Sequence, residues 1–339
     1  MPAPSISVVG AGLAGLAIAE ALLQRGAHVT LIEQTGVGAG ASGAATGLLH
    51  PFPGLRAQIP WEGETAFSAA CQQVTICSDI EPDVILARGV WRPCNPSQSD
   101  AFRKVATAHG TDFHVQWCEA GPPVALPAGI AAQEGLWIPN GLVVDVPLYL
   151  ATWCQDLVQR GMKWEQRSWS PSDITGITVL ATGAELGRSL GLELVRGQSL
   201  CLQVPDAVPL SCGVAGRAYI APGHHGWWVG ATFEHGATDL VPSPEAAKEL
   251  LRPRLSEIWH GPTPLLDQPL LEIRTGFRVS APSHLPVVGR WHGDVWIYSG
   301  LGSKGLIYHT YVGDLLAQAI LEGRPLPDPI QYRPKEVAT

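Results

Sequence analysis

Charged residues are scarce in this sequence: Asp, Glu, Lys and Arg make up 15% of its 339 residues, whereas hydrophobic residues make up 46%. The scarcity of charge excludes a coiled coil, and the abundance of apolar residues excludes a disordered chain. No apolar run suits a membrane span, because three glycines and Glu20 interrupt the segment from Ile6 to Leu23. No basic stretch precedes that segment, as a signal peptide would require. We therefore expect a cytoplasmic protein that does not associate with membranes.

Paired metal-ligand motifs and an excess of basic charge are also lacking. The adjacent His224 and His225 would point to opposite faces of a strand, so we expect no metal site there. The formal net charge of −8 argues mildly against non-specific binding of nucleic acid. The length allows about two domains of ~150 residues. The seven cysteines form no CxxC pair, which disfavours both a zinc site and a disulfide framework: they are Cys71, Cys77, Cys94, Cys118, Cys154, Cys201 and Cys212.

The first part of the chain predicts a strand over 5–9, a helix over 13–24 and a second strand over 28–33. The turn between strand and helix reads Gly10-Ala11-Gly12-Leu13-Ala14-Gly15, a GxGxxG pattern. Its glycines permit a tight turn, a close approach of the backbone to a pyrophosphate, and close packing of helix on strand. Glu33 ends the second strand, where a carboxylate accepts hydrogen bonds from ribose hydroxyls. This unit predicts dinucleotide binding. The Glu33 carboxylate disfavours NADP, because it would repel the 2′-phosphate of that cofactor.

The rest of the chain alternates between two patterns. Short runs such as 90–92 and 113–117, separated by proline and glycine, predict antiparallel strands and loops between 84 and 139. A helix over 147–160 and a buried strand over 177–181 follow. From 200 to 233 apolar and polar residues alternate, which again predicts strands. A helix over 244–259, a strand over 295–298 and a helix over 306–321 complete the prediction. Nucleotide-binding pieces therefore lie at both ends and in the middle, which indicates interleaved domains.

Several motifs together resemble the D-amino-acid oxidase superfamily of FAD enzymes, which includes glycine oxidase and sarcosine oxidase. The small-residue stretch from Gly40 to Pro51 gives a backbone that can lie against a large planar ligand. The resemblance rests on this stretch, on the Gly-rich opening and on the motifs at 181–184, 229–234, 274–278, 284–289 and 300–306. It implies an α/β fold in which a Rossmann-type FAD-binding domain (GR2-like) is interleaved with an antiparallel-sheet substrate domain. The FAD-binding parts are expected at 1–85, 140–195 and 274–339, and the substrate parts at 86–139 and 196–273.

Within the superfamily, the sequences of four segments are most similar to those of the FAD-dependent domain of the MnmC subfamily: 42–51, 283–289, 301–306 and 323–327. That domain removes a carboxymethyl group from carboxymethylaminomethyl-uridine in tRNA. Two departures stand out: no counterpart of the methyltransferase domain of those enzymes is present, and Lys304 stands where arginine is usual. The resemblance implies an oxidoreductase that transfers a hydride from the carbon beside an amine nitrogen to flavin N5. Molecular oxygen is then the expected acceptor, yielding hydrogen peroxide.

The resemblance also assigns residues to roles. Arg278, with a planar fork that matches a carboxylate, is the first candidate to anchor the substrate, and Lys304, Tyr219 and His50 are the other candidate catalytic residues. FAD is expected to be bound non-covalently, since no cysteine lies near 300–306. The predicted FAD-binding residues are Gly10, Ala11, Gly12, Leu13, Ala14, Gly15, Glu33, Gln34, Ala41, Ser42, Gly47, Leu48, Leu49, Thr182, Gly183, Gly300, Gly302, Ser303, Lys304, Gly305 and Leu306.

Three functions stay open at this point, and the oligomeric state is open as well. A tRNA-modifying enzyme predicts a basic rim around the cleft, drawn from Arg56, Arg88, Arg92, Arg103, Arg188, Arg252 and Arg254. A small amino-acid oxidase acting on glycine, sarcosine or D-amino acids predicts a closed and mostly apolar pocket. A flavin-binding protein without turnover predicts that Arg278 and Lys304 point away from the cofactor.

Overall fold

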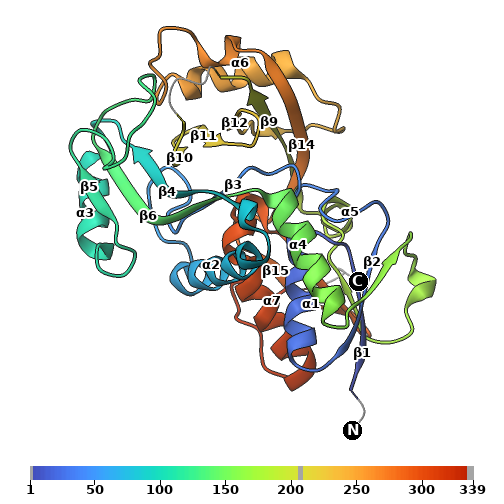
Figure 1. Cartoon of the computed structure of the whole chain (residues 1–339). Coiled ribbons are helices and arrows are strands. Elements are labelled where there is room, and N and C mark those ends of the chain that lie inside the picture. Colours follow the sequence, from blue (N-terminus) through green and yellow to red (C-terminus); the bar gives the residue numbers. More distant parts are fainter. Residues whose placement is uncertain (1–2, 205–208, 334–339) are drawn as a thin grey trace, which may run out of the picture.

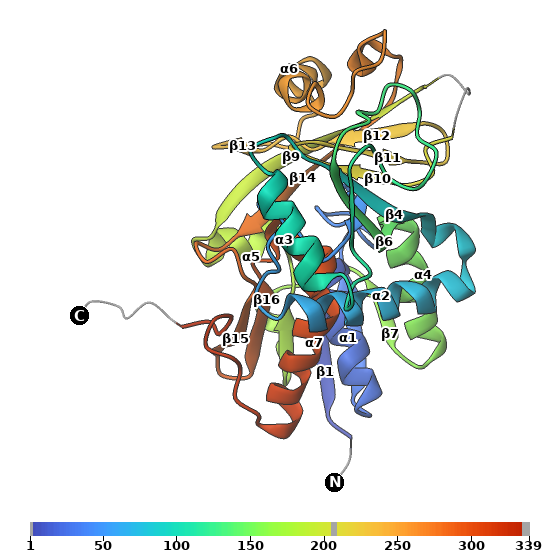
Figure 2. The same cartoon turned by 90° about the vertical axis from the view of Figure 1, so that its left-hand side faces the viewer.

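A computed structural model describes residues 3–204 and 209–333 of the chain. Over these residues two sheets lie one above the other, as Figures 1 and 2 show from two sides. No helix among them is both long and apolar enough to cross a bilayer. In the described part of the chain, seven α-helices accompany the sheets: α1 (Leu13–Gln24), α2 (Gly63–Ile80), α3 (Ser99–His109), α4 (Val146–Gln159), α5 (Ala184–Ser189), α6 (Pro244–Leu255) and α7 (Gly305–Glu322).

The first sheet is mainly parallel and begins with the predicted βαβ unit. Its order is β15 (Val287–His292), β16 (Val295–Ser299), β8 (Thr178–Leu180), β1 (Ser5–Val9), β2 (His28–Glu33) and β7 (Lys163–Gln166), with only β15 antiparallel to its neighbour. β1, α1 and β2 have the bounds that the sequence predicted. Strands buried on both faces read as continuous apolar runs, which is why this unit is visible in the sequence.

The second sheet is mainly antiparallel, and only its β10–β4 pair is parallel. Its order is β13 (Glu234–His235), β9 (Glu193–Leu202), β12 (Trp227–Gly230), β11 (Tyr219–Pro222), β10 (Gly213–Ala215), β4 (Ile85–Pro93), β6 (Gly135–Val144) and β3 (Gly47–Leu49). β14 (Leu270–Ser280) also pairs with β9, and β5 (Gln116–Cys118) with β6. The predicted α/β fold with parallel and antiparallel sheets is confirmed. The limits of the five predicted segments stay a prediction, and those at 139 and 273 fall within β6 and β14.

Buried polar contacts and a close helix crossing join three helices that accompany the first sheet, namely α1, α4 and α7. The buried Glu20 carboxylate of α1 accepts hydrogen bonds from the Trp153 indole at 2.9 Å and from Arg160 at 2.6 Å, which ties α1 to α4. The Tyr149 hydroxyl meets the buried His309 ring at 2.8 Å, which ties α4 to α7. α7 lies against α1, where a Cβ on Gly313 would come 2.9 Å from the backbone of Ala17. The N-terminus of α7 is thereby fixed beside the first sheet.

Two features between 84 and 139 differ from the sequence prediction. The segment Ser99–His109 is a helix, although only strands and loops were expected there. It was missed because its apolar face is narrow: Phe102 is its only buried residue, and Val105 and Ala106 beside it are half-buried. The predicted strand over 113–117 is also displaced: Phe113 still bonds to the carbonyl of His109, and β5 begins at Gln116. The predicted helix at 244–259 ends earlier, at Leu255.

Candidate functional site

A cleft of about 920 Å³ opens between the two sheets. This volume lies at the upper end of the range of ligand pockets. One wall comes from the carboxyl ends of β1, β2 and β8, the loop from Ala39 to Leu55 and the start of α7. The other wall comes from β9, β11, β12 and β14 of the second sheet. Ligands of open α/β sheets bind at the carboxyl ends of the strands, which is where this cleft lies.

The predicted GxGxxG turn forms the floor of the cleft, and each of its glycines is required by geometry. Gly10 has a φ of 104°, and a Cβ there would lie 2.5 Å from the carbonyl oxygen of Ala181. A Cβ on Gly15 would lie 1.7 Å from the carbonyl oxygen of Gly10, so only glycine lets α1 pack on β1. A Cβ on Gly12 would meet the Ser42 hydroxyl at 2.9 Å. The turn therefore exposes bare backbone at the N-terminus of α1, where unpaired N–H groups favour a phosphate.

Glu33 and Ser42 stand on either side of this turn. The Glu33 carboxylate accepts hydrogen bonds from the backbone N–H of Ala11 at 3.0 Å and of Thr35 at 2.9 Å. The Ser42 hydroxyl accepts one from the N–H of Leu13 at 3.1 Å. Both side chains line the cleft. The carboxylate is thereby held at the end of β2, where it can take the hydroxyls of a ribose.

The start of α7 supplies a second helix N-terminus to the cleft. Gly300 and Gly302 have φ angles of 71° and 52°, and this tight turn lets the chain pass directly from β16 into α7. Gly305, Leu306 and Ile307 line the cleft, so the first N–H groups of the helix lie beside it. The positive end of the helix dipole favours negative charge on a ligand there. These features fit an FAD molecule. The GxGxxG turn and Glu33 suit its pyrophosphate and ribose, and the N-terminus of α7 suits a negatively charged edge at its other end.

His50 and Arg92 lie at the end of the cleft where the loop leaves β3. His50 lines the cleft, is buried, and has no hydrogen-bond partner at Nδ1. Burial, and then the Arg92 charge, lower the pKa of His50 to about 3, so its ring is neutral at physiological pH. Arg92 is itself buried and donates to the carbonyls of Phe52 and Gly54. It therefore holds the cleft wall and is not part of a surface rim.

Arg278 and Tyr219 lie on the opposite wall, within the second sheet. The Arg278 guanidinium donates to the carbonyl of Thr232 at 3.0 Å and lies 4.5 Å from the centre of the Phe233 ring. Burial lowers its pKa, yet the guanidinium stays charged. The Tyr219 hydroxyl meets the Ser199 hydroxyl at 2.7 Å, and burial raises the pKa of the phenol. The structure thus brings both predicted residues to the cleft.

Three predicted residues do not line the cleft. Lys304 directs its ammonium group to the carbonyl of His284 at 3.0 Å, so the expected contact with a substrate carboxylate has no support in this geometry. Gly15 faces β1 and not the cleft, for the packing reason given above. Leu49 points into the core, with none of its surface exposed. The other predicted cofactor-binding residues line the cleft.

The predicted basic rim is mostly absent. Of its seven arginines only Arg254 lines the cleft, and it is joined by Arg167, Arg217 and Arg278. Arg167 and Arg217 are paired with acids. Arg103 instead pairs with Glu119 and Glu134, and Arg252 pairs with Asp267. The cleft is therefore neither ringed by charge nor closed and apolar.

Sequence reasoning missed Trp169 and Phe233, which also line the cleft. Trp169 follows β7, a short edge strand without an apolar alternation that could have marked it. Phe233 was quoted within the motif at 229–234 but received no role, and it is 44% exposed. A large exposed aromatic side chain beside two arginines is a signal of binding that only the tertiary structure reveals.

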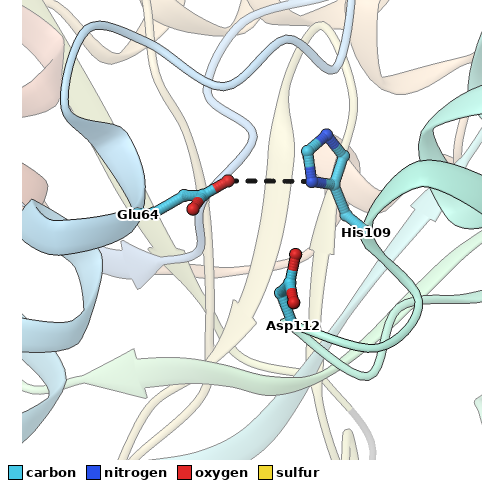
Figure 3. A group of neighbouring side chains, drawn as sticks. All are labelled: Glu64, His109 and Asp112. Atoms are coloured by element: carbon cyan, nitrogen blue, oxygen red, sulfur yellow. Dashed lines mark ion pairs between the residues drawn. The ribbon is translucent and has the colours of Figure 1, made fainter.

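The possible metal ligands lie elsewhere. His224 and His225 occupy the turn between β11 and β12, so the argument from a strand does not apply to them. Glu64, His109 and Asp112 gather where α2 meets the end of α3, with His109 3.8 Å from Glu64 (Figure 3). Both carboxylates of that group are exposed. All seven cysteines lie within the described residues, and none of them lines the cleft.

Comparisons with known proteins agree with this geometry. MnmC, the bifunctional tRNA 5-methylaminomethyl-2-thiouridine biosynthesis protein, is 29% identical over 371 residues in Polaromonas naphthalenivorans, covering 94% of this chain and 57% of the relative. The Thiobacillus denitrificans protein is 26% identical over 362 residues, covering 95% and 57%. This chain thus spans little more than half the length of these relatives.

Two solved structures share the fold. Glycine oxidase from Geobacillus kaustophilus has a TM-score of 0.77 at 21% identity, covering 94% of this chain and 95% of that one. Iminodiacetate oxidase from Chelativorans sp. BNC1 has a TM-score of 0.74 at 22% identity, covering 95% and 96%. A family model described as DAO, FAD dependent oxidoreductase, matches residues 5–319. The chain belongs to this DAO family of FAD-dependent oxidoreductases.

Proposed function

We propose that this chain oxidises a C–N bond of an amine that carries a carboxylate, with the carboxymethylaminomethyl group of a tRNA uridine as the leading substrate. The observation that carries the proposal is the place of Arg278. Its guanidinium lines the cleft on the wall opposite the GxGxxG turn. A planar guanidinium binds a carboxylate in two-point fashion, and this one forms no ion pair with an acid of the described residues.

The neighbours of Arg278 support the same role. The protonated Tyr219 hydroxyl, already bonded to Ser199, can present a second polar group to the carboxylate. A neutral amine is the reactive form, because its lone pair must be free. The charges of Arg278 and Arg254 disfavour a protonated amine beside them. The neutral His50 ring adds no further charge.

The residues that would hold FAD are those of the turn and its two flanks. The backbone N–H groups of Gly12 and Ala14 would face the pyrophosphate, Glu33 the ribose, and the start of α7 the negative edge of the ring system. FAD, when bound, supplies the acceptor for the two electrons that leave the amine. The protein's share of the catalysis is to hold the carbon in place and to exclude other orientations.

A second candidate is the oxidation of a free amino acid such as glycine, sarcosine or a D-amino acid. The same Arg278 anchor supports it, and so does the likeness to the fold of glycine oxidase. The open mouth of the cleft, with its exposed Phe233, favours a larger substrate. Molecular oxygen is the acceptor that we propose for either substrate.

Anaerobic bleaching of the bound flavin tests both candidates. The holoenzyme is mixed without oxygen with glycine, sarcosine, D-alanine or tRNA bearing carboxymethylaminomethyl-uridine, and absorbance is followed near ~450 nm, where flavins absorb. We expect the modified tRNA to bleach the flavin fastest. Faster bleaching by a free amino acid would select the second candidate. Bleaching by dithionite alone would leave only a flavin-binding protein without turnover.

A further inference from the structure

Arg254 provides a positive charge beside Arg278 in the cleft that the anchoring of one carboxylate does not require. It comes from the last turn of α6, which crosses above the second sheet (Figures 1 and 2), and its side chain lines the cleft. Its guanidinium donates to the carbonyl of Ala231 at 3.1 Å. Arg278 donates to the next carbonyl along the chain, that of Thr232. Two guanidinium groups are thus held by neighbouring peptide units.

The ring of Phe233 lies close to both of these cations. Arg278 is 4.5 Å and Arg254 5.9 Å from its centre. Both distances suit cation–π contacts, which fix the planes of the guanidiniums without neutralising them. Because both guanidiniums contact one ring, a single ligand beside Phe233 can reach both of them. Burial lowers the pKa of Arg278, and the Arg254 charge lowers it further.

No acid neutralises this pair among the described residues. Glu234 is the carboxylate that acts on Arg278, but it is bonded to Arg196 at 2.6 Å. Asp239 also pairs with Arg196, at 2.9 Å. By contrast, Arg252 in the same turn of α6 has its own partner, Asp267. Of the two arginines in this turn of α6, Arg252 is therefore paired outside the cleft, whereas Arg254 is unpaired inside it.

We infer that Arg254 binds a second anionic group of the substrate, so that the substrate is at least a dianion. This inference rests on the proposed function, which assigns the first carboxylate to Arg278. The second group is an oxyanion that reaches past Phe233 towards the mouth of the cleft. A phosphate of a nucleotide and a second carboxylate share this chemistry, and the experiment below separates them.

Spectral titration of the oxidised holoenzyme with unreactive ligands tests the inference. The thioether acids (methylthio)acetate, called methylthioacetate below, and thiodiglycolate form one pair, with one and two carboxylates. The nucleoside 5-carboxymethyluridine and its 5′-monophosphate form the second pair, without and with a phosphate. None of the four has the amine that is oxidised. We expect the member of one pair that carries the second anionic group to bind at least tenfold more tightly than its partner, and that pair identifies the oxyanion.

Three variants make the test decisive. Arg254→Gln should weaken binding of the preferred ligand with two anionic groups at least five times more than binding of its partner with one. Arg252→Gln is the matched control and should change neither. The inference is overturned if neither pair shows a preference, or if the preference survives in Arg254→Gln. Failure of the proposed function looks different: Arg278→Gln would then leave methylthioacetate binding unchanged.

Discussion

The Arg278 guanidinium lies directly over Gly197: a Cβ on Gly197 would come 2.2 Å from Nη1. The two residues sit on neighbouring strands, β14 and β9, where Gly276 pairs with Gly197. Only a residue without a side chain leaves room for the guanidinium at this place. The position of the proposed anchor is therefore set by a glycine on the adjacent strand.

Substitution of Gly197 by alanine should displace the anchor without unfolding the protein. The atoms that the new methyl group meets belong to the end of a flexible side chain, so the guanidinium moves and the backbone does not. We expect a higher KM for a carboxylate-bearing amine, with unchanged FAD content and a Tm close to that of the wild type. Gly176→Ala, where a Cβ meets nothing within 4 Å, is the control. An unaltered KM would show that Arg278 is not the anchor.

Removal of the anchor itself should be more severe. Arg278→Ala deletes charged hydrogen bonds worth about 2 to 3 kcal/mol, so kcat/KM should fall by one to two orders of magnitude. Arg274→Ala changes the same strand outside the cleft, where Arg274 pairs with Glu272 and covers Trp228. Steady-state kinetics that gave equal losses for the two variants would argue against a specific role of Arg278.

The GxGxxG turn predicts a different outcome for Gly15→Ala. Here the new methyl group would meet a backbone carbonyl, and neither α1 nor β1 can yield cheaply. Overpacking at a fixed contact of this kind costs about 3 kcal/mol. Urea unfolding should show that loss together with a lower FAD content, whereas Gly36→Ala, in open space, should show neither. A Gly15→Ala protein of normal stability would contradict the described packing of α1 on β1.

Stability should depend on pH through the buried His309. Burial lowers its pKa from 6.5 to about 4. Between these two pH values the histidine is therefore mostly protonated in the unfolded chain and mostly neutral in the folded chain. Stability is therefore full above pH 6.5 and is lost as the pH falls towards 4, by up to about 3 kcal/mol. His309→Gln should flatten the slope of unfolding free energy against pH in this window. An equally steep slope in the variant would assign the pH dependence to other groups.

The sequence predicted the elements whose signals are local. The first strand, helix and strand are marked by a buried apolar pattern and a GxGxxG turn. The last predicted helix, over 306–321, corresponds to α7, which is capped by Gly323 with a φ of 68°. α2 and α3 escaped prediction. The buried face of α2 is made largely of small residues such as Ala66 and Ala70, and α3 buries only Phe102. The site shows the same division. Gly12 and Glu33 belong to a sequence motif, whereas Arg254, Phe233 and Arg278 come together only when α6, the segment between β12 and β13, and β14 meet.

The most direct test of the account is a comparison of sarcosine with dimethylamine, which lacks the carboxylate, as anaerobic reductants of the bound flavin. Modified tRNA serves beside them as the larger carboxylate-bearing substrate. The account predicts that at least one carboxylate-bearing amine bleaches the flavin and that dimethylamine does not. Bleaching by dimethylamine at the same rate, or by none of the amines while dithionite still acts, would contradict it.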